Sequence, residues 1–404
     1  MTESFAPEAI ETFLPSSAKA PVQNVVLELQ RAAKQLGAAR LGIAEASDDS
    51  QASERFAAWI ERGYFGEMNY LKSPRVGPEQ LLPGAKSVLV LAFSYGAELV
   101  RRPARSVAAY AEGPDYHHVL KLRLRALGQQ CAELLGTRVR ARLCVDTAPL
   151  LERRWAERAG IGFTGKSTLT VAPGLGTAFV LGELIIDQAL PASRPVRDGC
   201  GECTACLNVC PTGAFVDAYT LDARRCIAYL TIEHKGSIAY DLRAGIGERV
   251  FGCDECQRVC PYNASRKLPK RSLDLEPESF DEPDLVGLLT LSSSAYRKWV
   301  QGTARRRTSR AQLQRNAAIA IGNRGREADV PVLCTTLNRS AYPVVRAHVA
   351  WALGQIGGLA ALDALSARIS SEPDQTVQSE ITRALRRFAS LNANQGLATE
   401  PTAS

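Results

Sequence analysis

Most of the cysteines in this 404-residue chain lie in two short runs whose spacing suits iron–sulfur chemistry. Residues 200–211 read CGECTACLNVCP, with cysteines at intervals of x2, x2 and x3 and a proline after the last. That progression is typical of bacterial proteins that hold two [4Fe–4S] clusters and transfer electrons. Residues 253–261, CDECQRVCP, repeat the pattern without its first cysteine. Cys226, the only other cysteine between the runs, supplies the missing thiolate and completes the set that two clusters require.

The order of the cysteines also predicts which of them share a cluster. In such runs, three closely spaced cysteines hold one cluster and the cysteine before the proline reaches the other. The ligands of cluster one are therefore expected to be Cys200, Cys203, Cys206 and Cys260. Those of cluster two are expected to be Cys210, Cys226, Cys253 and Cys256. Structural zinc is the alternative, because paired Cys-x2-Cys elements also form tetrahedral sites, but a zinc ribbon does not require this progression.

The rest of the composition indicates a cytoplasmic protein with reduced thiols. The N-terminus, MTESFAPEAIETF, carries acidic residues and no secretory pattern, so a disulfide framework is not expected. Cys131, Cys144 and Cys334 are then expected to be small buried hydrophobic residues. The apolar stretches SVLVLAF and TAFVLGELII are too short for a bilayer span and predict buried strands. We expect no membrane segment and a monomeric protein.

The net charge of +7 is concentrated in one segment near the C-terminal third of the chain. Between Tyr296 and Gly325 there are eight basic residues and no acidic residue: Arg297, Lys298, Arg305, Arg306, Arg307, Arg310, Arg315 and Arg324. Uncompensated positive charge beside aromatic residues favours a polyanionic partner, because phosphate contacts dominate nucleic-acid affinity. We expect the seven from Arg297 to Arg315 to contact RNA; a solvated helix face without a partner is the alternative.

Alternating helical and β-rich patterns divide the chain into parts. Residues 1–20 are Ser-, Ala- and Pro-rich and are expected to be disordered. Residues 21–195 predict a mixed α and β domain, and residues 196–275 a cluster domain that depends on its metal for much of its stability. Residues 276–390 are expected to be helical, and residues 391–404 a disordered tail.

The C-terminal part repeats with a period of 32 residues. The small and aliphatic residues of RAHVAWALGQIG, at 346–357, recur in RNAAIAIGNRG 32 residues earlier and in SEITRALRRF 32 residues later. Gly322 and Gly354 keep the same offset. About three such units are close to the minimum at which stacked helical repeats bury a continuous core. The pattern predicts a short helical solenoid that begins beside the cluster domain and offers a binding face for nucleic acid.

Two short motifs are open to misreading. GIGFTGKS at 160–167 satisfies the phosphate-loop pattern, but a charged helix precedes it and a β-rich segment follows, which inverts the strand–loop–helix context that ATP binding needs. DYHHVLK at 115–121 lacks the glycine expected of a histidine that ligates cobalt from below. A nucleotide site and a histidine-ligated corrinoid are therefore not expected.

Asp146, at the end of the β-rich run VRARLCVD, is a candidate catalytic acid, with a plain helix cap as the alternative. Its segment, CVDTAPLLERRWAERAGIGFTGKSTL, follows AYAEGPDYH, GEMNYL and LLPGAKSVLVLAFSY in the chain. Together with the two cysteine runs, and over residues from about 20 to 390, this combination closely resembles the epoxyqueuosine reductase family.

The resemblance implies an α+β multidomain fold: a nitroreductase-like α/β domain that binds cobalamin, a two-cluster bacterial ferredoxin-like domain and C-terminal α-helical HEAT-like repeats. It implies reduction of epoxyqueuosine to queuosine in the tRNA anticodon loop, with base-off cobalamin that has no protein ligand and an external low-potential electron donor. Asp146 would be the proton donor, and Asn69, Lys166 and Thr170 would contact the corrinoid beside it. An acid in this role is expected to have a raised pKa.

Two other functions are alternatives. A reductive dehalogenase acting on a small molecule would ordinarily carry an N-terminal twin-arginine signal, and Arg101-Arg102 lies too deep in the chain to serve. A non-catalytic ferredoxin-type module would not need the folded domain that precedes the clusters. A cobalamin absorption spectrum separates the second alternative from an enzyme.

Overall fold

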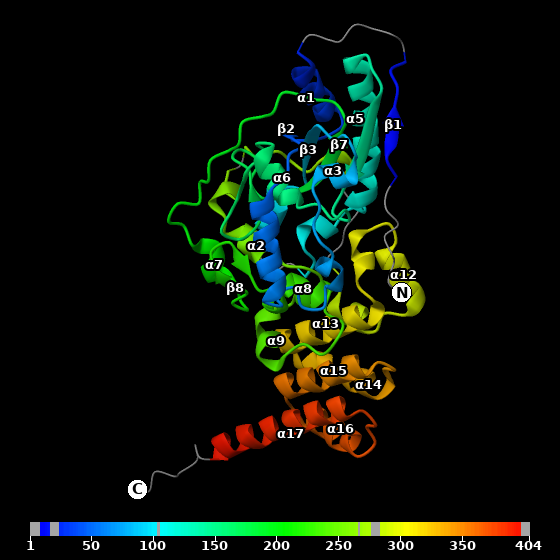
Figure 1. The fold of residues 1–404 in the computed structure, drawn as a ribbon. Coiled ribbons are helices and arrows are strands. Elements are labelled where there is room, and N and C mark those ends of the chain that lie inside the picture. The colour runs from blue at the N-terminus through cyan, green and yellow to red at the C-terminus, as the bar shows by residue number, and fades with distance from the viewer. Residues whose placement is uncertain (1–8, 17–23, 103–105, 266, 276–282, 397–404) are drawn as a thin grey trace.

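The structure, a computed structural model, describes the chain apart from residues 1–8, 17–23, 103–105, 266, 276–282 and 397–404. Figure 1 shows a sheet with covering helices at one end, a stack of helices at the other, and the cysteine-rich segment between them. The α+β fold and the helical C-terminal part expected from the sequence are confirmed. In the described part of the chain, no helix is both long and apolar enough for a membrane span.

A five-stranded antiparallel sheet forms the centre of the N-terminal part. Its strand order is β1-β4-β7-β3-β2. The strands are β1 (Glu11–Phe13), β2 (Arg40–Glu45), β3 (Ser87–Ser94), β4 (Val139–Cys144) and β7 (Phe179–Ile186). The middle strands β3 and β7 are almost entirely buried, as their apolar sequences predict.

Helices cover both faces of this sheet. On one face, α1 (Val25–Gln35) and α5 (Tyr116–Leu135) pack against Leu91 and Leu184. On the other face, α6 (Glu152–Arg158) packs against Val90 and Ile185 through Trp155. Because successive strand residues face opposite sides, Glu183 shares the α6 face with Ile185. The remaining elements before the cysteine runs are α2 (Ser50–Glu61), η1 (Asn69–Lys72), α3 (Pro78–Leu81), α4 (Ala97–Val100), η2 (Ala109–Ala111), β5 (Phe163–Thr164) and β6 (Thr170–Val171).

Both chain ends depart from the expectation of disorder. The prediction for residues 1–20 is wrong at β1, which pairs with β4 because the ring of Phe13 is buried against Gly128 of α5. The rest of that segment lies largely outside the described residues. The prediction of a disordered tail from residue 391 is wrong for residues 391–396, since α17 (Gln375–Gly396) continues to residue 396.

Small elements carry the cysteines. They are α7 (Ala205–Val209), β8 (Phe215–Asp217), β9 (Thr220–Leu221), η3 (Ala223–Arg225), α8 (Ile227–Ile232), α9 (Tyr240–Ile246), α10 (Glu255–Arg258), η4 (Pro261–Asn263) and η5 (Leu273–Leu275). The β8–β9 hairpin is a separate two-stranded sheet. A buried network joins this segment to the large sheet, because Asn263 hydrogen-bonds to Thr177 and Gln257, and Gln257 accepts from Tyr95.

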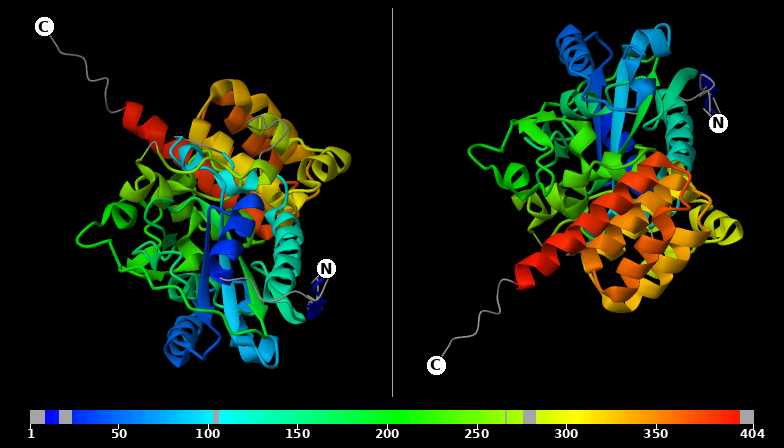
Figure 2. Two further views of the ribbon diagram at one scale, coloured as in Figure 1. Left: turned by 90° about the horizontal axis from the view of Figure 1, so that it is seen from above. Right: turned by 90° about the horizontal axis from the view of Figure 1, so that it is seen from below.

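The C-terminal helices form the expected stack, which Figure 2 shows from both ends of the molecule. They are α11 (Leu285–Leu289), α12 (Ser293–Val300), η6 (Ala304–Arg307), α13 (Arg310–Arg324), η7 (Glu327–Asp329), α14 (Val330–Arg339), α15 (Pro343–Ile356), α16 (Leu359–Ile369) and α17. The 32-residue repeat corresponds to α13, α15 and α17, which pack in succession. A Cβ on Gly322 would lie 2.7 Å from the Trp351 ring, and one on Gly354 2.7 Å from Ala384, so both glycines permit close helix packing.

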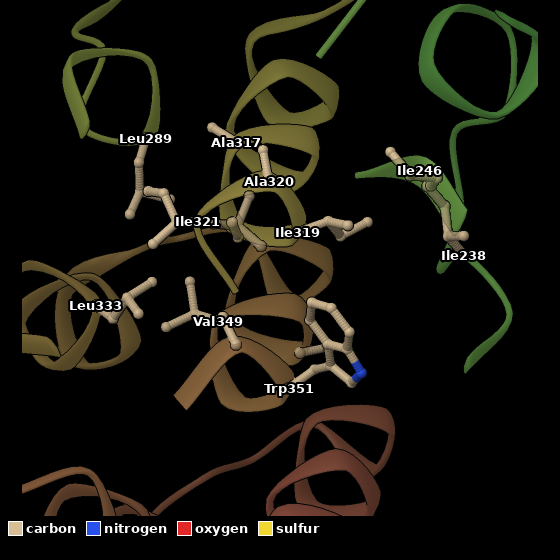
Figure 3. Close-up of a cluster of buried hydrophobic side chains, with 14 of the residues drawn as sticks. Ile238, Ile246, Leu289, Ala317, Ile319, Ala320, Ile321, Leu333, Val349 and Trp351 are labelled. Atoms are coloured by element: carbon tan, nitrogen blue, oxygen red, sulfur yellow. The ribbon is translucent and has the colours of Figure 1, made fainter. Parts of the chain in front are cut away.

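One hydrophobic core spans the second half of the cysteine-rich segment and the repeats. Figure 3 shows Ile238 and Ile246 facing the side of α13 and α15 that carries Ile319 and Trp351. The expectation that clusters supply much of the stability of residues 196–275 therefore omits a contribution, because residues 227–251 are held by apolar packing against α13.

Candidate active site

Asp146 lies in a tight turn just after β4. Its φ of 59° is in the left-handed region, which a non-glycine residue adopts only when its surroundings impose it. The Tyr116 hydroxyl donates to Asp146 Oδ2 over 3.0 Å, and His117 Nε2 lies 3.3 Å from the same oxygen. The Asp146 backbone N–H donates to Glu152 Oε1. Since α6 begins at Glu152 with Leu151 as its cap residue, Asp146 is not a helix cap.

The start of α5 delivers His117 to this carboxylate. Asp115 caps the helix by accepting a hydrogen bond from the His117 backbone N–H. Its Oδ1 also lies 2.7 Å from His117 Nδ1, which fixes the ring between two carboxylates. The Asp-x-His spacing in DYHH therefore serves to orient a histidine toward Asp146. Sequence reasoning considered this histidine only as a cobalt ligand and missed the contact.

The Asp146–His117 pair is ionised at neutral pH. Burial opposes the charge of His117, but its hydrogen bonds to Asp115 and Asp146 outweigh burial and raise its pKa to about 9. Burial likewise favours neutral Asp146, yet His117, Tyr116 and the charge of Arg153 hold the pKa of this carboxyl below its ordinary value. The expectation of a raised Asp146 pKa is therefore wrong, because the proton resides on His117 instead.

Asp146 is open to solvent. Its side chain is 62 % exposed, although burial among protein atoms is the largest influence on its pKa. Tyr70 of η1 is in the same situation: it is 46 % exposed, while burial and then Glu233 raise its pKa to about 12. The charge of Asp146 contributes to that shift, so the two side chains are close enough to interact. A cavity of about 250 Å³ lies between α2 and α6, and its lining includes Arg75, whose pKa responds to the charge of Asp146.

Side chains from all three parts of the chain meet around Asp146. The Tyr110 ring lies 6.2 Å from that of Tyr116, which donates to Asp146, and 6.3 Å from that of Phe251, just before the second cysteine run. From the repeats, Arg307 pairs with Glu233 and its guanidinium lies 5.1 Å from the centre of the Tyr70 ring. Arg306 lies 3.3 Å from Asp115, the residue that orients His117. The site is therefore adjacent to both the cysteines and the basic segment.

The thiols predicted for cluster one influence one another electrostatically. Burial is the main cause of the raised pKa of Cys260, and the charges of Cys200, Cys206 and Cys203 add to it. The pKa of Cys206 likewise responds to burial and then to Cys200. Such effects fall off with distance, so the proline-adjacent cysteine of the second run is close enough to the first run to interact with its thiols, which supports the predicted grouping.

The thiols predicted for cluster two also influence one another electrostatically. Burial and then the charge of Cys210 raise the pKa of Cys226. The pKa of Cys253, raised to about 12 mainly by burial, also responds to Cys226, and that of Cys256 responds to both and to Cys206 of the first run. The Ala214 backbone N–H donates to Cys210 Sγ over 3.3 Å, a contact that stabilises a thiolate.

Within the described residues, no three cysteine, histidine or acidic side chains converge closely enough to hold one metal ion. Zinc needs four ligands at about 2.0–2.3 Å, whereas each thiolate of a [4Fe–4S] cluster binds a different iron and the sulfurs stand apart. Outside these sets, Cys131 and Cys144 are fully buried and Cys334 is half-buried.

The three residues expected to contact a corrinoid occupy different environments. Asn69 is exposed at the start of η1, beside Tyr70. Thr170 is buried in β6, and its hydroxyl has no hydrogen-bonding partner within the described residues. Lys166 donates to the Gly201 carbonyl over 2.6 Å, so it anchors the first cysteine run. The loop that carries it connects two short antiparallel strands, β5 and β6, which excludes the strand–loop–helix arrangement of an ATP site.

The basic segment is less exposed than its sequence suggests. The prediction of RNA contact is wrong for Arg315, which is fully buried and donates to the carbonyls of Leu230, His234 and Gly236. It is also wrong for Arg305, which is 7 % exposed and donates to the Ala111 and Trp299 carbonyls. Both side chains donate hydrogen bonds to buried backbone carbonyls where the C-terminal helices contact the rest of the chain. A count of charges in the sequence cannot reveal this role.

The other basic residues differ in their exposure to solvent and in their partners. Arg297, Lys298 and Arg306 are exposed, and Arg307 is exposed but paired with Glu233. Arg310 is half-buried and donates to Leu291 O and the Tyr342 hydroxyl. Arg324 pairs with Asp329, which follows just after the segment.

Comparison with known proteins agrees with this site. Residues 75–147 match the family described as epoxyqueuosine reductase QueG, DUF1730, residues 199–263 a 4Fe-4S double cluster binding domain, and residues 298–386 HEAT repeats. The chain is 39 % identical to the epoxyqueuosine reductase of Salmonella typhimurium over 80 % of this chain and 85 % of that protein. For the Pseudomonas aeruginosa enzyme the identity is 40 %, over 80 % and 92 %.

Solved structures give the same result. A crystal structure of epoxyqueuosine reductase with an epoxyqueuosine-modified tRNA-Tyr stem loop is 32 % identical, with a TM-score of 0.82, covering 91 % of this chain and 100 % of that one. The Streptococcus thermophilus enzyme is 29 % identical, with a TM-score of 0.81 and the same coverage. The identity and the coverage show that this chain belongs to the epoxyqueuosine reductase family.

Proposed function

We propose that this protein reduces epoxyqueuosine to queuosine at the wobble position of tRNA, the last step of queuosine synthesis. The observation that carries the proposal is the set of contacts around Asp146, where an acid–base pair, the two-cluster domain and the basic repeats meet. Membership of the family supports it, as does the tRNA stem loop bound to a relative. We also propose that the protein acts in the cytoplasm as a monomer and receives electrons from an external low-potential donor.

The eight thiolates would hold two [4Fe–4S] clusters in the grouping predicted from their order, and would carry electrons one at a time. The cofactor of the proposal is cobalamin, base-off and without a protein ligand to cobalt, which would supply low-potential reducing chemistry for the epoxide. Two observations fit that cofactor: the solvent-exposed carboxylate of Asp146 and the orphaned hydroxyl of Thr170. Asn69 and Thr170 would hold it, while Lys166 is engaged elsewhere.

Asp146 and His117 would transfer a proton to the substrate. Cleavage of the epoxide C–O bond leaves negative charge on oxygen, and a positioned acid lowers the barrier by protonating it as the charge develops. Because the proton of the pair resides on His117, Asp146 would pass it from His117 Nε2 to the epoxide oxygen. Tyr116, which donates to the same carboxylate oxygen, would hold the Asp146 side chain in position.

The test is the Asp146→Asn substitution in holoenzyme prepared without oxygen. The variant is expected to keep its iron and cobalamin spectra but to lose at least about 100-fold in the rate of queuosine formation. Mass spectrometry of tRNA nucleosides measures the rate. Full activity in Asp146→Asn would remove the residue from the mechanism.

The matched control for the whole function is a cell that lacks the gene. Its tRNA is expected to accumulate epoxyqueuosine, and unchanged queuosine there would refute the proposal. Cluster absorption without cobalamin absorption in the purified protein would instead favour a plain electron carrier.

A further inference from the structure

Residues 59–70 belong to the N-terminal part of the sequence but are held mainly by the rest of the chain. This segment, which we call the strap, runs from the end of α2 to the start of η1, between β2 and β3 in the sequence. Trp59 and Met68 pack against the hydrophobic core that spans the cysteine-rich segment and the repeats. The strap ends with the exposed residues Asn69 and Tyr70.

The cysteine-rich segment binds the first half of the strap just before Cys226. The Trp59 indole N–H donates to the Leu221 carbonyl over 2.7 Å. The Ala223 backbone N–H donates to the Tyr64 carbonyl over 3.0 Å. Because these contacts are made only a few residues before Cys226, the strap and this thiol are fixed to the same short stretch of chain.

Tyr229 of α8 holds the second half of the strap. Its side chain is 7 % exposed, and its hydroxyl accepts a hydrogen bond from the Glu67 backbone N–H over 2.8 Å. The preceding residue, Gly66, has a φ of 61°, and a Cβ at this position would overlap the Tyr229 hydroxyl. The strap therefore approaches Tyr229 as closely as a glycine allows.

The side chain of Glu67 is fixed as well as its backbone. Glu67 Oε2 accepts a hydrogen bond from the Lys235 backbone N–H over 3.0 Å, and Oε1 lies 3.0 Å from His234 Nδ1. The other ring nitrogen of His234 lies 3.0 Å from the Ser237 carbonyl. The imidazole thus joins the strap to the loop that follows α8. With both carboxylate oxygens engaged, the contacts set the orientation of the strap as well as its position.

These anchors immediately precede the two residues that lie near the site. The Asn69 backbone N–H donates to the Glu67 carbonyl over 2.8 Å, so the position of Glu67 determines that of Asn69. The Tyr70 ring lies 5.1 Å from the guanidinium of Arg307. The arginine just before it pairs with the aspartate that orients the histidine at Asp146. A displacement of the strap at Glu67 would therefore move both Asn69 and Tyr70.

We propose that Tyr229 is a positioning residue, whose hydroxyl holds the strap so that Asn69 lies where the cofactor binds. The inference rests on the proposed function, in which Asn69 contacts cobalamin. Tyr229 acts through the backbone of Glu67 and from a buried place on a helix. Such a residue suits the role, because groups on packed helices hold a site more precisely than groups on loops.

Tyr229→Phe tests the hydroxyl and keeps the ring that packs in the core. Without its acceptor, the Glu67 amide is expected to exchange with deuterium at least about five-fold faster, measured by mass spectrometry of a peptide that spans the strap. The dissociation constant for cobalamin, from absorption titration of the cluster-loaded protein, should rise about five-fold. Turnover at saturating cobalamin should stay within about two-fold of wild type, because the groups at Asp146 are unchanged.

The matched control is Tyr219→Phe, in the same part of the chain. It also removes a tyrosine hydroxyl that makes one hydrogen bond, to Asp198 over 2.8 Å, but this residue does not touch the strap. Neither the exchange of the strap nor the affinity for cobalamin is expected to change in this variant.

Gly66→Ala and Gly63→Ala separate the contact with Tyr229 from backbone strain. Both glycines lie in the left-handed region, with φ of 61° and 67°, so the two alanines strain the backbone alike. Only the new Cβ at Gly66 would meet Tyr229, whereas nothing lies within 4 Å of one at Gly63. Gly66→Ala is expected to exceed Tyr229→Phe in both effects, and Gly63→Ala to keep the wild-type affinity for cobalamin.

Two results would overturn the proposal. Unchanged exchange of the strap in Tyr229→Phe would show that the hydroxyl does not hold it. Faster exchange with wild-type affinity for cobalamin would show that the contact serves the fold alone. Both measurements are independent of turnover, so a protein that binds cobalamin but leaves epoxyqueuosine unreduced would refute the proposed function and not the role of Tyr229. Wild-type protein that binds no cobalamin would refute both.

Discussion

The cysteine runs and the basic segment both look like binding motifs in the sequence, but the fold treats them in opposite ways. The thiols influence one another electrostatically, mostly within the two groups that their spacing predicts, and Cys256 also responds to Cys206 of the other group. The basic residues separate, because Arg305 and Arg315 turn inward to carbonyl groups while Arg297 and Lys298 remain at the surface. The thiolate ligands of one iron–sulfur cluster must all bind the same small group of atoms. A basic side chain can instead donate to any nearby hydrogen-bond acceptor, including a backbone carbonyl. Spacing is therefore a stronger predictor of a site than charge.

The largest effect is expected from removal of Cys226, the ligand that lies outside both runs. Cys226→Ala should lower the iron and sulfide content by about half, because one cluster loses a thiolate, and reduction of the modified tRNA should cease. Iron and sulfide analysis after oxygen-free preparation measures this. Cys334→Ala is the control and should retain all its iron. A full complement of iron in Cys226→Ala would contradict the proposed grouping.

The two kinds of arginine in the basic segment predict opposite phenotypes. Arg315→Met should lower the free energy of unfolding by about 3–5 kcal/mol, since several buried carbonyls lose a charged donor. Arg297→Met should change it by less than about 0.5 kcal/mol, because the side chain is exposed. Urea denaturation of both variants under one buffer distinguishes them, and equal decreases in stability would contradict the structural role of Arg315.

The exposed basic residues Arg297 and Lys298 predict an effect on tRNA binding. Arg297→Gln with Lys298→Gln should weaken binding several-fold and reduce the slope of log K against log salt by about 0.7–0.9 for each phosphate that is no longer neutralised. Titration of an anticodon stem loop at several salt concentrations measures the slope. If the affinity and the slope both stay at their wild-type values, the RNA-binding surface lies elsewhere.

The ionised pair at the catalytic turn predicts a smaller, pH-dependent effect. The pKa of His117 is raised in the folded protein, so the stability that it contributes is complete below about pH 6.5 and is lost as the pH rises through about 9. Wild type should exceed His117→Gln by about 1–2 kcal/mol at pH 6, and the difference should shrink toward pH 10. Urea denaturation across this range gives the difference, and a constant gap would contradict the ionised pair.

Particular residues show how far the sequence could lead to the site. Asp146 could be predicted from the sequence because its motif places it after a strand. The phosphate-loop pattern could be rejected because the elements expected on either side of it are reversed. The lowered pKa of Asp146 could not be predicted, because it depends on His117, which reaches the turn from the start of another helix. Glu183 had a faint signal, a single charge within the apolar strand TAFVLGELII, but its complete burial depends on how α6 packs on the sheet.

The sequence by itself determined the metal chemistry, the repeat architecture and the strands, because each is written in local spacing: cysteine intervals, a 32-residue period, and runs of apolar residues. The tertiary structure decided which charges face solvent and where the proton of the Asp146–His117 pair resides. Those properties depend on burial and on partners distant in the chain, and both arise only when the sheet, the cysteine-rich segment and the repeats pack together.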